Sequence, residues 1–102
     1  MGGSFGPSFF MSNLLLFSKK ECGPCILVKK YFNTMSDSRT ESVKELLLDD
    51  GYEENLSIAK QYKINATPTL IVVNEDGEKV EEYIGGVDIT KNITKLLDQY
   101  IN

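Results

Sequence analysis

The feature that most constrains this fold is a pair of cysteines placed between an apolar run and a helical pattern. Cys22 and Cys25 are the only cysteines among the 102 residues, and Gly23 and Pro24 lie between them. Residues 13–18 form a short apolar run of the kind that is typical of a buried strand. Proline is tolerated in the first turn of a helix, where its missing N–H is not needed. The sequence therefore predicts a strand, a loop, and then a helix that begins at the cysteines.

The rest of the chain predicts an alternation of strands and helices. The expected elements are a helix over 23–35, a loop over 36–42, strands over 43–48, 69–73 and 79–84, a helix over 56–62 capped by Asn55, and a last helix that begins at Asp88 or Thr90. Residues 74–77 are a hairpin turn signal. The order β-α-β-α-β-β-α predicts an α/β fold in which three helices flank a four-stranded mixed sheet.

Length and composition are typical of a single globular domain. The formal net charge is −4, with 41% hydrophobic residues, so no affinity for nucleic acid or for anionic membranes is expected. Residues 1–10 contain no Lys or Arg and so lack the basic start of a signal peptide. We expect residues 1–10 to be a flexible lead-in or a vector-derived extension and residues 11–102 to be the domain. The expected state is a cytoplasmic monomer.

A Cys-x-x-Cys pair at the start of a helix predicts thiol–disulfide exchange. One thiolate attacks the disulfide of a target protein, and the second cysteine must be close enough to resolve the mixed disulfide. The unpaired N–H groups and the positive dipole end of the helix would lower the pKa of Cys22. We therefore expect Cys22 to attack and Cys25, one turn further into the helix, to resolve.

A structural disulfide and a zinc site are the alternatives for the cysteine pair, and each has less support than redox exchange. A purely structural disulfide would close a very small loop and gain little chain entropy. A zinc site needs four ligands, and the chain has two cysteines and no histidine. The expectation is therefore no bound metal or cofactor, and a redox-active disulfide between Cys22 and Cys25.

A second motif makes the pattern specific to one family. Ala66-Thr67-Pro68-Thr69 leads into the apolar strand, and together with Cys-Gly-Pro-Cys it resembles the thioredoxin family over roughly residues 13–101. The resemblance implies that Pro68 is cis and lies against the cysteines, and that the backbone at Thr67 pairs with an extended target segment. It also implies that Gly23 and Pro24 contact the target. The implied activity is protein-disulfide reduction, with thioredoxin reductase as electron donor and ribonucleotide reductase as a target known from the family.

The chain departs from the thioredoxin pattern at two positions near the cysteines. Glu21 stands where the family usually has tryptophan. Leu16 stands where many members carry a buried aspartate that is thought to accept the proton of the resolving cysteine. The first strand and helix of the family are also not found ahead of the run at 13–18. These departures leave the redox potential and the route of the Cys25 proton open.

Two alternatives follow from these departures. Gly85-Gly86-Val87-Asp88 resembles the segment with which glutaredoxins, together with Thr67 and a lysine such as Lys19, bind glutathione. Glutathione would then be the electron donor, although Gly-Pro between the cysteines differs from the Pro-Tyr usual in glutaredoxins. The two glycines also suit a simple strand end. The second alternative is a thioredoxin-fold binding subunit with incidental redox activity, which an exposed apolar patch beyond the active site would favour.

Overall fold

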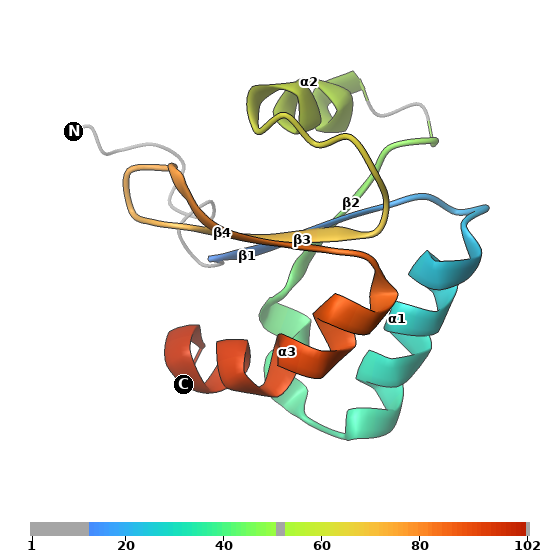
Figure 1. Cartoon of the computed structure of the whole chain (residues 1–102), viewed down its shortest axis with the longest axis vertical. Helices are drawn as coiled ribbons and strands as arrows, with labels where there is room; N and C mark the ends of the chain where they lie inside the picture. The colour runs from blue at the N-terminus through green and yellow to red at the C-terminus, as the bar shows by residue number, and fades with distance from the viewer. Residues whose placement is uncertain (1–12, 51–52, 102) are drawn as a thin grey trace.

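Four strands form one mixed sheet at the centre of the fold (Figure 1). The structure is a computed structural model that describes residues 13–50 and 53–101, so the predicted lead-in lies outside the described residues. The strands are β1 (Leu14–Ser18), β2 (Lys44–Leu47), β3 (Thr69–Val73) and β4 (Lys79–Ile84). Their order across the sheet is β2-β1-β3-β4, with β1 and β2 parallel and the other pairs antiparallel. The predicted four-stranded mixed sheet is confirmed.

The helices cover both faces of this sheet. Helices α1 (Gly23–Met35) and α3 (Gly86–Tyr100) lie on one face, and α2 (Glu53–Gln61) lies on the other (Figure 1). The central strands β1 and β3 are therefore buried along their whole length and read as continuous apolar runs. Successive residues of a strand point to opposite faces, so Leu16 packs with the α1 and α3 side, and Phe17 packs with the α2 side.

The structure differs from the sequence predictions in the loop after α1 and at the start of two helices. The predicted loop over 36–42 contains a 3₁₀ helix, η3 (Ser38–Ser42), because the Asp37 carboxylate caps it by accepting the Arg39 N–H at 3.0 Å. Helix α2 begins at Glu53, so Asn55 is not its cap. The Asn55 side chain instead donates to the Leu47 carbonyl oxygen at 2.9 Å and so ties α2 to the end of β2.

The last helix also begins earlier than predicted. Helix α3 starts at Gly86, with Gly85 as its N-cap, so Asp88 and Thr90 lie within the helix rather than at its cap. Gly85 has a φ of 93° and a ψ of 153°, a conformation that L side chains rarely adopt. The glycine backbone, rather than a side-chain cap, therefore makes the turn from β4 into α3. No helix in the described part of the chain is both long and apolar enough to span a bilayer.

Candidate active site

The two cysteines lie at the junction of β1 and α1 and form a disulfide. Cys22 is the N-cap of α1, and its sulfur accepts a hydrogen bond from the Cys25 N–H at 3.3 Å. The helix N-terminus is thus directed at Cys22, as the sequence predicted. Cys22 is half-buried, whereas Cys25 is only 1% exposed. The sulfur of Cys22 is therefore the one that a target protein can approach.

The loop that leads to Cys22 is anchored by the end of β2. The Asp49 carboxylate accepts hydrogen bonds from the backbone N–H of Lys20 at 2.9 Å and of Glu21 at 3.4 Å. These hydrogen bonds, of which the one from Lys20 contributes most, hold the pKa of Asp49 below its ordinary value. The sequence predicts Asp49 in a solvated turn at the end of the strand over 43–48, with an influence on Cys25 as the less favoured alternative. The available signal was its place after β2, since parallel neighbours such as β1 and β2 end at the same edge of the sheet.

Thr67 and Pro68 lie against the exposed cysteine. The Thr67 hydroxyl lies 3.7 Å from the Cys22 sulfur, and the Thr67 carbonyl oxygen lies 3.8 Å from it. The Thr67–Pro68 peptide bond is cis, which confirms the expectation from the resemblance. The Pro68 carbonyl oxygen accepts a hydrogen bond from the Gly85 N–H at 2.9 Å. This bond joins the segment before β3 to the start of α3.

The two glycines at the start of α3 lie beside the cysteine helix. A Cβ atom on Gly86 would lie 3.7 Å from the Pro24 carbonyl oxygen and 3.6 Å from Val28 Cγ2. The predicted site residues thus gather at one end of the sheet. They come from three segments: Cys22, Gly23, Pro24 and Cys25; Thr67 and Pro68; Gly85 and Gly86.

Leu16 leaves β1 without a carboxylate beneath the cysteine helix. Leu16 is 2% exposed and belongs to the apolar core between the sheet and α1. Its partner across the parallel pair is Glu45 of β2. Glu45 Oε2 accepts a hydrogen bond from the buried Ser18 hydroxyl at 2.6 Å and lies 3.2 Å from Lys29 Nζ of α1. The carboxylate that faces α1 at this level of the sheet is therefore supplied by β2.

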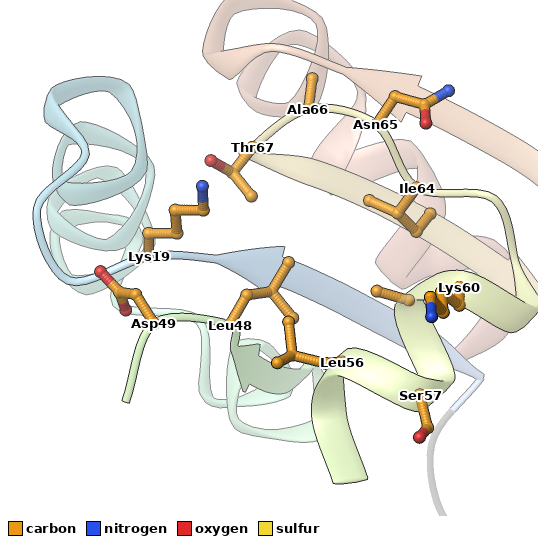
Figure 2. A pocket seen from close by; sticks show the side chains of 11 residues that line it. Lys19, Leu48, Asp49, Leu56, Ser57, Lys60, Ile64, Asn65, Ala66 and Thr67 are labelled. Carbon is orange, nitrogen blue, oxygen red and sulfur yellow. The ribbon is translucent and has the colours of Figure 1, made fainter. Parts of the chain in front are cut away.

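A groove of about 520 Å³ opens beside Thr67 (Figure 2). Figure 2 shows the Lys19 amino group on the Thr67 side of this groove, with Leu48 and Leu56 along its floor. Its remaining lining residues come from the end of β2, from α2 and from the segment that leads to Thr67: Asp49, Ser57, Ala59, Lys60, Ile64, Asn65 and Ala66. The sequence patterns gave no sign of this groove, because its residues are dispersed along the chain.

A second hollow, of about 480 Å³, adjoins the cysteines on the side of α3. Pro24, Gly86 and Val87 line it together with Leu27 and Tyr31 of α1. Leu27 is 65% exposed and Val87 is 80% exposed, so an apolar surface is present. Because Pro24 and Gly86 belong to the site itself, this surface extends the active site and is not a separate patch beyond it.

Within residues 13–50 and 53–101, no group of three or more His, Cys, Asp or Glu side chains is placed to hold a metal ion. A strand–helix junction that carries a Cys-x-x-Cys disulfide, with Thr67 against the exposed sulfur, defines a dithiol site for thiol–disulfide exchange.

Comparison with known proteins agrees with this class. Residues 12–101 match the family model of the thioredoxin-like domain. Thioredoxin 1 of Synechococcus elongatus is 31% identical over 80 residues, which are 78% of this chain and 71% of the relative. A thioredoxin of Staphylococcus epidermidis is also 31% identical over 80 residues, which are 78% of this chain and 73% of the relative. This chain belongs to the thioredoxin family.

Solved structures show the same fold. Thioredoxin O2 from Arabidopsis thaliana, in its oxidised state, superposes with a TM-score of 0.64 at 24% identity, over 87% of this chain and 74% of the other. The chain is therefore a thiol–disulfide oxidoreductase that reduces protein disulfides, with Cys22–Cys25 as its dithiol pair. The relatives are thioredoxins, so the glutaredoxin-like alternative is not favoured.

Proposed function

We propose that Cys22 is the attacking thiol and Cys25 the resolving thiol of this reductase. The observation that supports these roles is the difference in burial, with Cys22 half-buried at the N-cap and Cys25 only 1% exposed. The Cys22 thiolate attacks one target sulfur, forms a mixed disulfide and releases the other target sulfur as a thiolate. The Cys25 thiolate then attacks Cys22 Sγ, forms the Cys22–Cys25 disulfide and releases the second target thiolate. Two electrons pass to the target, whose thiolates take up two protons.

The residues around Cys22 would hold the target during this exchange. The Thr67 carbonyl, 3.8 Å from the Cys22 sulfur, would pair with an extended target segment beside the mixed disulfide. Pro68 supports this position through its bond to Gly85. Gly23 and Pro24, which are exposed, would contact the target on the helix side, and Gly86 would form the wall next to Pro24.

We further propose that thioredoxin reductase supplies the electrons and that the protein works in the cytoplasm. Membership of the thioredoxin family and the Gly-Pro pair between the cysteines support this donor over glutathione. A reducing compartment such as the cytosol is where a dithiol reductant is kept reduced. Ribonucleotide reductase is a candidate target at the level of the family.

A paired turnover assay tests the donor. One arm supplies NADPH and thioredoxin reductase, and the other supplies glutathione, glutathione reductase and NADPH, each with insulin as disulfide substrate. Turnover sustained only by the first arm is expected. Turnover sustained only by glutathione would contradict the proposal on the donor and leave the reductase activity standing.

Trapping variants test the roles of the cysteines. Cys25→Ser is expected to accumulate a mixed disulfide with the target, because no second thiol is present to resolve it. The matched variant Cys22→Ser is expected to accumulate none. Non-reducing electrophoresis with and without added dithiothreitol reads the result, and trapping by Cys22→Ser alone would reverse the two roles.

A further inference from the structure

The groove beside Thr67 is continuous with the reactive sulfur. Thr67 both lines the groove and touches Cys22, with its hydroxyl 3.7 Å from the sulfur. An extended chain advances about 3.3 Å per residue. A target segment that leaves the mixed disulfide past Thr67 therefore enters the groove within a few residues.

The floor of the groove is apolar and open to a partner. Leu48, Leu56 and Ile64 line it, and Leu56 is 47% exposed although it is a large hydrophobic side chain. Ala59 and Ala66 are small enough to leave the floor uncrowded. An apolar side chain of a bound segment would be shielded from water there, which favours binding.

The basic side chains that line the groove are available to a ligand, whereas its acidic side chain is already hydrogen-bonded. Lys19 and Lys60 are both exposed, and neither forms an ion pair with any residue that the structure describes. Asp49, the carboxylate of the groove, is already occupied by the Lys20 and Glu21 backbone N–H groups. Lys19 is close enough to Asp49 to contribute a small coulombic lowering of its pKa. The groove thus offers a ligand the two ammonium groups, whereas the Asp49 carboxylate is already hydrogen-bonded.

We propose that this groove binds the target polypeptide beside its reactive cysteine and selects segments that carry an acidic side chain next to an apolar one. The carboxylate would lie beside Lys19, at the Thr67 end of the groove, with Lys60 adding positive charge at the far end, and the apolar side chain would lie on Leu48 and Leu56 between them. This inference rests on the proposed reduction of protein disulfides at Cys22 and names the class of target that the same site prefers.

Two disulfide peptides that differ in one flanking residue test the proposal. Both carry the same disulfide and the same apolar neighbour, and one has Glu where the other has Lys. The ratio of kcat/KM for the two peptides is measured, so changes common to both peptides cancel. Exposed ion pairs are individually weak, and the exchange of attraction for repulsion when Glu is replaced by Lys predicts a preference for the Glu peptide of about tenfold at most. Screening predicts that this ratio falls towards one as salt is raised to 1 M, where the Debye length is about 3 Å.

Variants then assign the preference to the groove. Lys19→Gln combined with Lys60→Gln is expected to bring the ratio close to one. The matched control, Lys30→Gln combined with Lys91→Gln, removes the same net charge from exposed positions on α1 and α3 and is expected to keep the wild-type ratio.

The outcomes separate this inference from the proposed function. Equal rates for the two peptides with the wild-type protein would overturn the charge selection. So would a preference that survives in Lys19→Gln/Lys60→Gln, or one that the control pair loses equally. Reduction of a small neutral disulfide, bis(2-hydroxyethyl) disulfide, by the wild-type protein is measured in parallel. Failure with this disulfide and with both peptides would refute the reductase activity itself, whereas reduction of both peptides at equal rates would refute the groove alone.

Discussion

Gly85 and Gly86 are adjacent, yet the structure predicts opposite effects when each is replaced by alanine. Gly85 has a φ of 93° and a ψ of 153°, in a region that is essentially restricted to glycine. Placing a side chain there costs about 1–3 kcal/mol. Gly86 begins α3 with no positive φ, and a new Cβ would meet Val28 Cγ2 at 3.6 Å, an ordinary contact. Gly86→Ala is therefore expected to stabilise by about 0.4–1 kcal/mol, because it restricts the unfolded chain.

Urea denaturation of the oxidised proteins measures this difference. Keeping the disulfide intact in both variants removes redox state as a variable. The free energy of unfolding of Gly85→Ala should fall below that of Gly86→Ala by at least about 1.4 kcal/mol, the sum of the two smaller effects. In thermal unfolding, each 1 kcal/mol corresponds to about 4–8 °C for a domain of this size. Equal stability of the two variants, or a less stable Gly86→Ala, would refute the reasoning.

The same pair of variants bears on why the two glycines are present. A glutathione site would require bare backbone at both positions, whereas the structure requires glycine at Gly85 alone. Gly85 also donates its N–H to the Pro68 carbonyl oxygen at 2.9 Å, so its conformation supports the segment that lies against Cys22. The backbone thus supports a role for the two glycines in ending β4 and turning the chain into α3.

Three predictions concern single side chains. Ser18→Ala should lower the free energy of unfolding by about 1 kcal/mol in urea denaturation, because the fully buried hydroxyl donates to a β2 carboxylate at 2.6 Å. In the folded protein the pKa of Asp49 lies below its ordinary 3.8. The hydrogen bonds from the loop N–H groups to the Asp49 carboxylate are therefore complete above pH 3.8 and are lost as the pH falls through the folded pKa. Hydrogen exchange should then show the Lys20 amide losing protection in acid, a change absent from Asp49→Ala. The hydrogen bond to Glu81 raises the pKa of Tyr83 to about 12, so an alkaline absorbance titration should contain a tyrosine step near this pH that Tyr83→Phe removes.

Patterns that depend on neighbouring residues were predicted well from the sequence. The runs of β1 and β3 are continuous because helices cover both faces of the central strands. The start of α1 followed from Pro24, which suits a first helical turn. The start of α3 was wrong, because Asp88 looked like a side-chain cap and the sequence does not reveal that the backbone at Gly85 makes the turn.

The groove could not be predicted, because tertiary packing creates it. Lys19 follows β1, Leu48 follows β2, and Lys60 lies near the end of α2. Separately, each lysine has the pattern of an ordinary surface residue. Packing of α2 on its face of the sheet brings the three segments to one place, and this packing is set by the core around Phe17 and Tyr62. The candidate site was therefore predictable at the cysteines and at Thr67-Pro68, whereas the adjoining groove was not.

The replacement of the family's buried aspartate by Leu16 has a consequence for where charge lies in this site. β1 is buried at every residue, so an ionised group on it would lose its hydration. Glu45 and Asp49, two of the carboxylates near the cysteine helix, come instead from β2 and the residues after it. β2 is an edge strand, and the Glu45 side chain keeps 29% of its surface exposed. Glu45 thus stays in contact with water, and Asp49 accepts the loop N–H groups. In relatives that carry the buried aspartate, the redox potential depends on a carboxylate beneath the resolving cysteine. The redox potential of the Cys22–Cys25 pair should therefore not be inferred from those relatives.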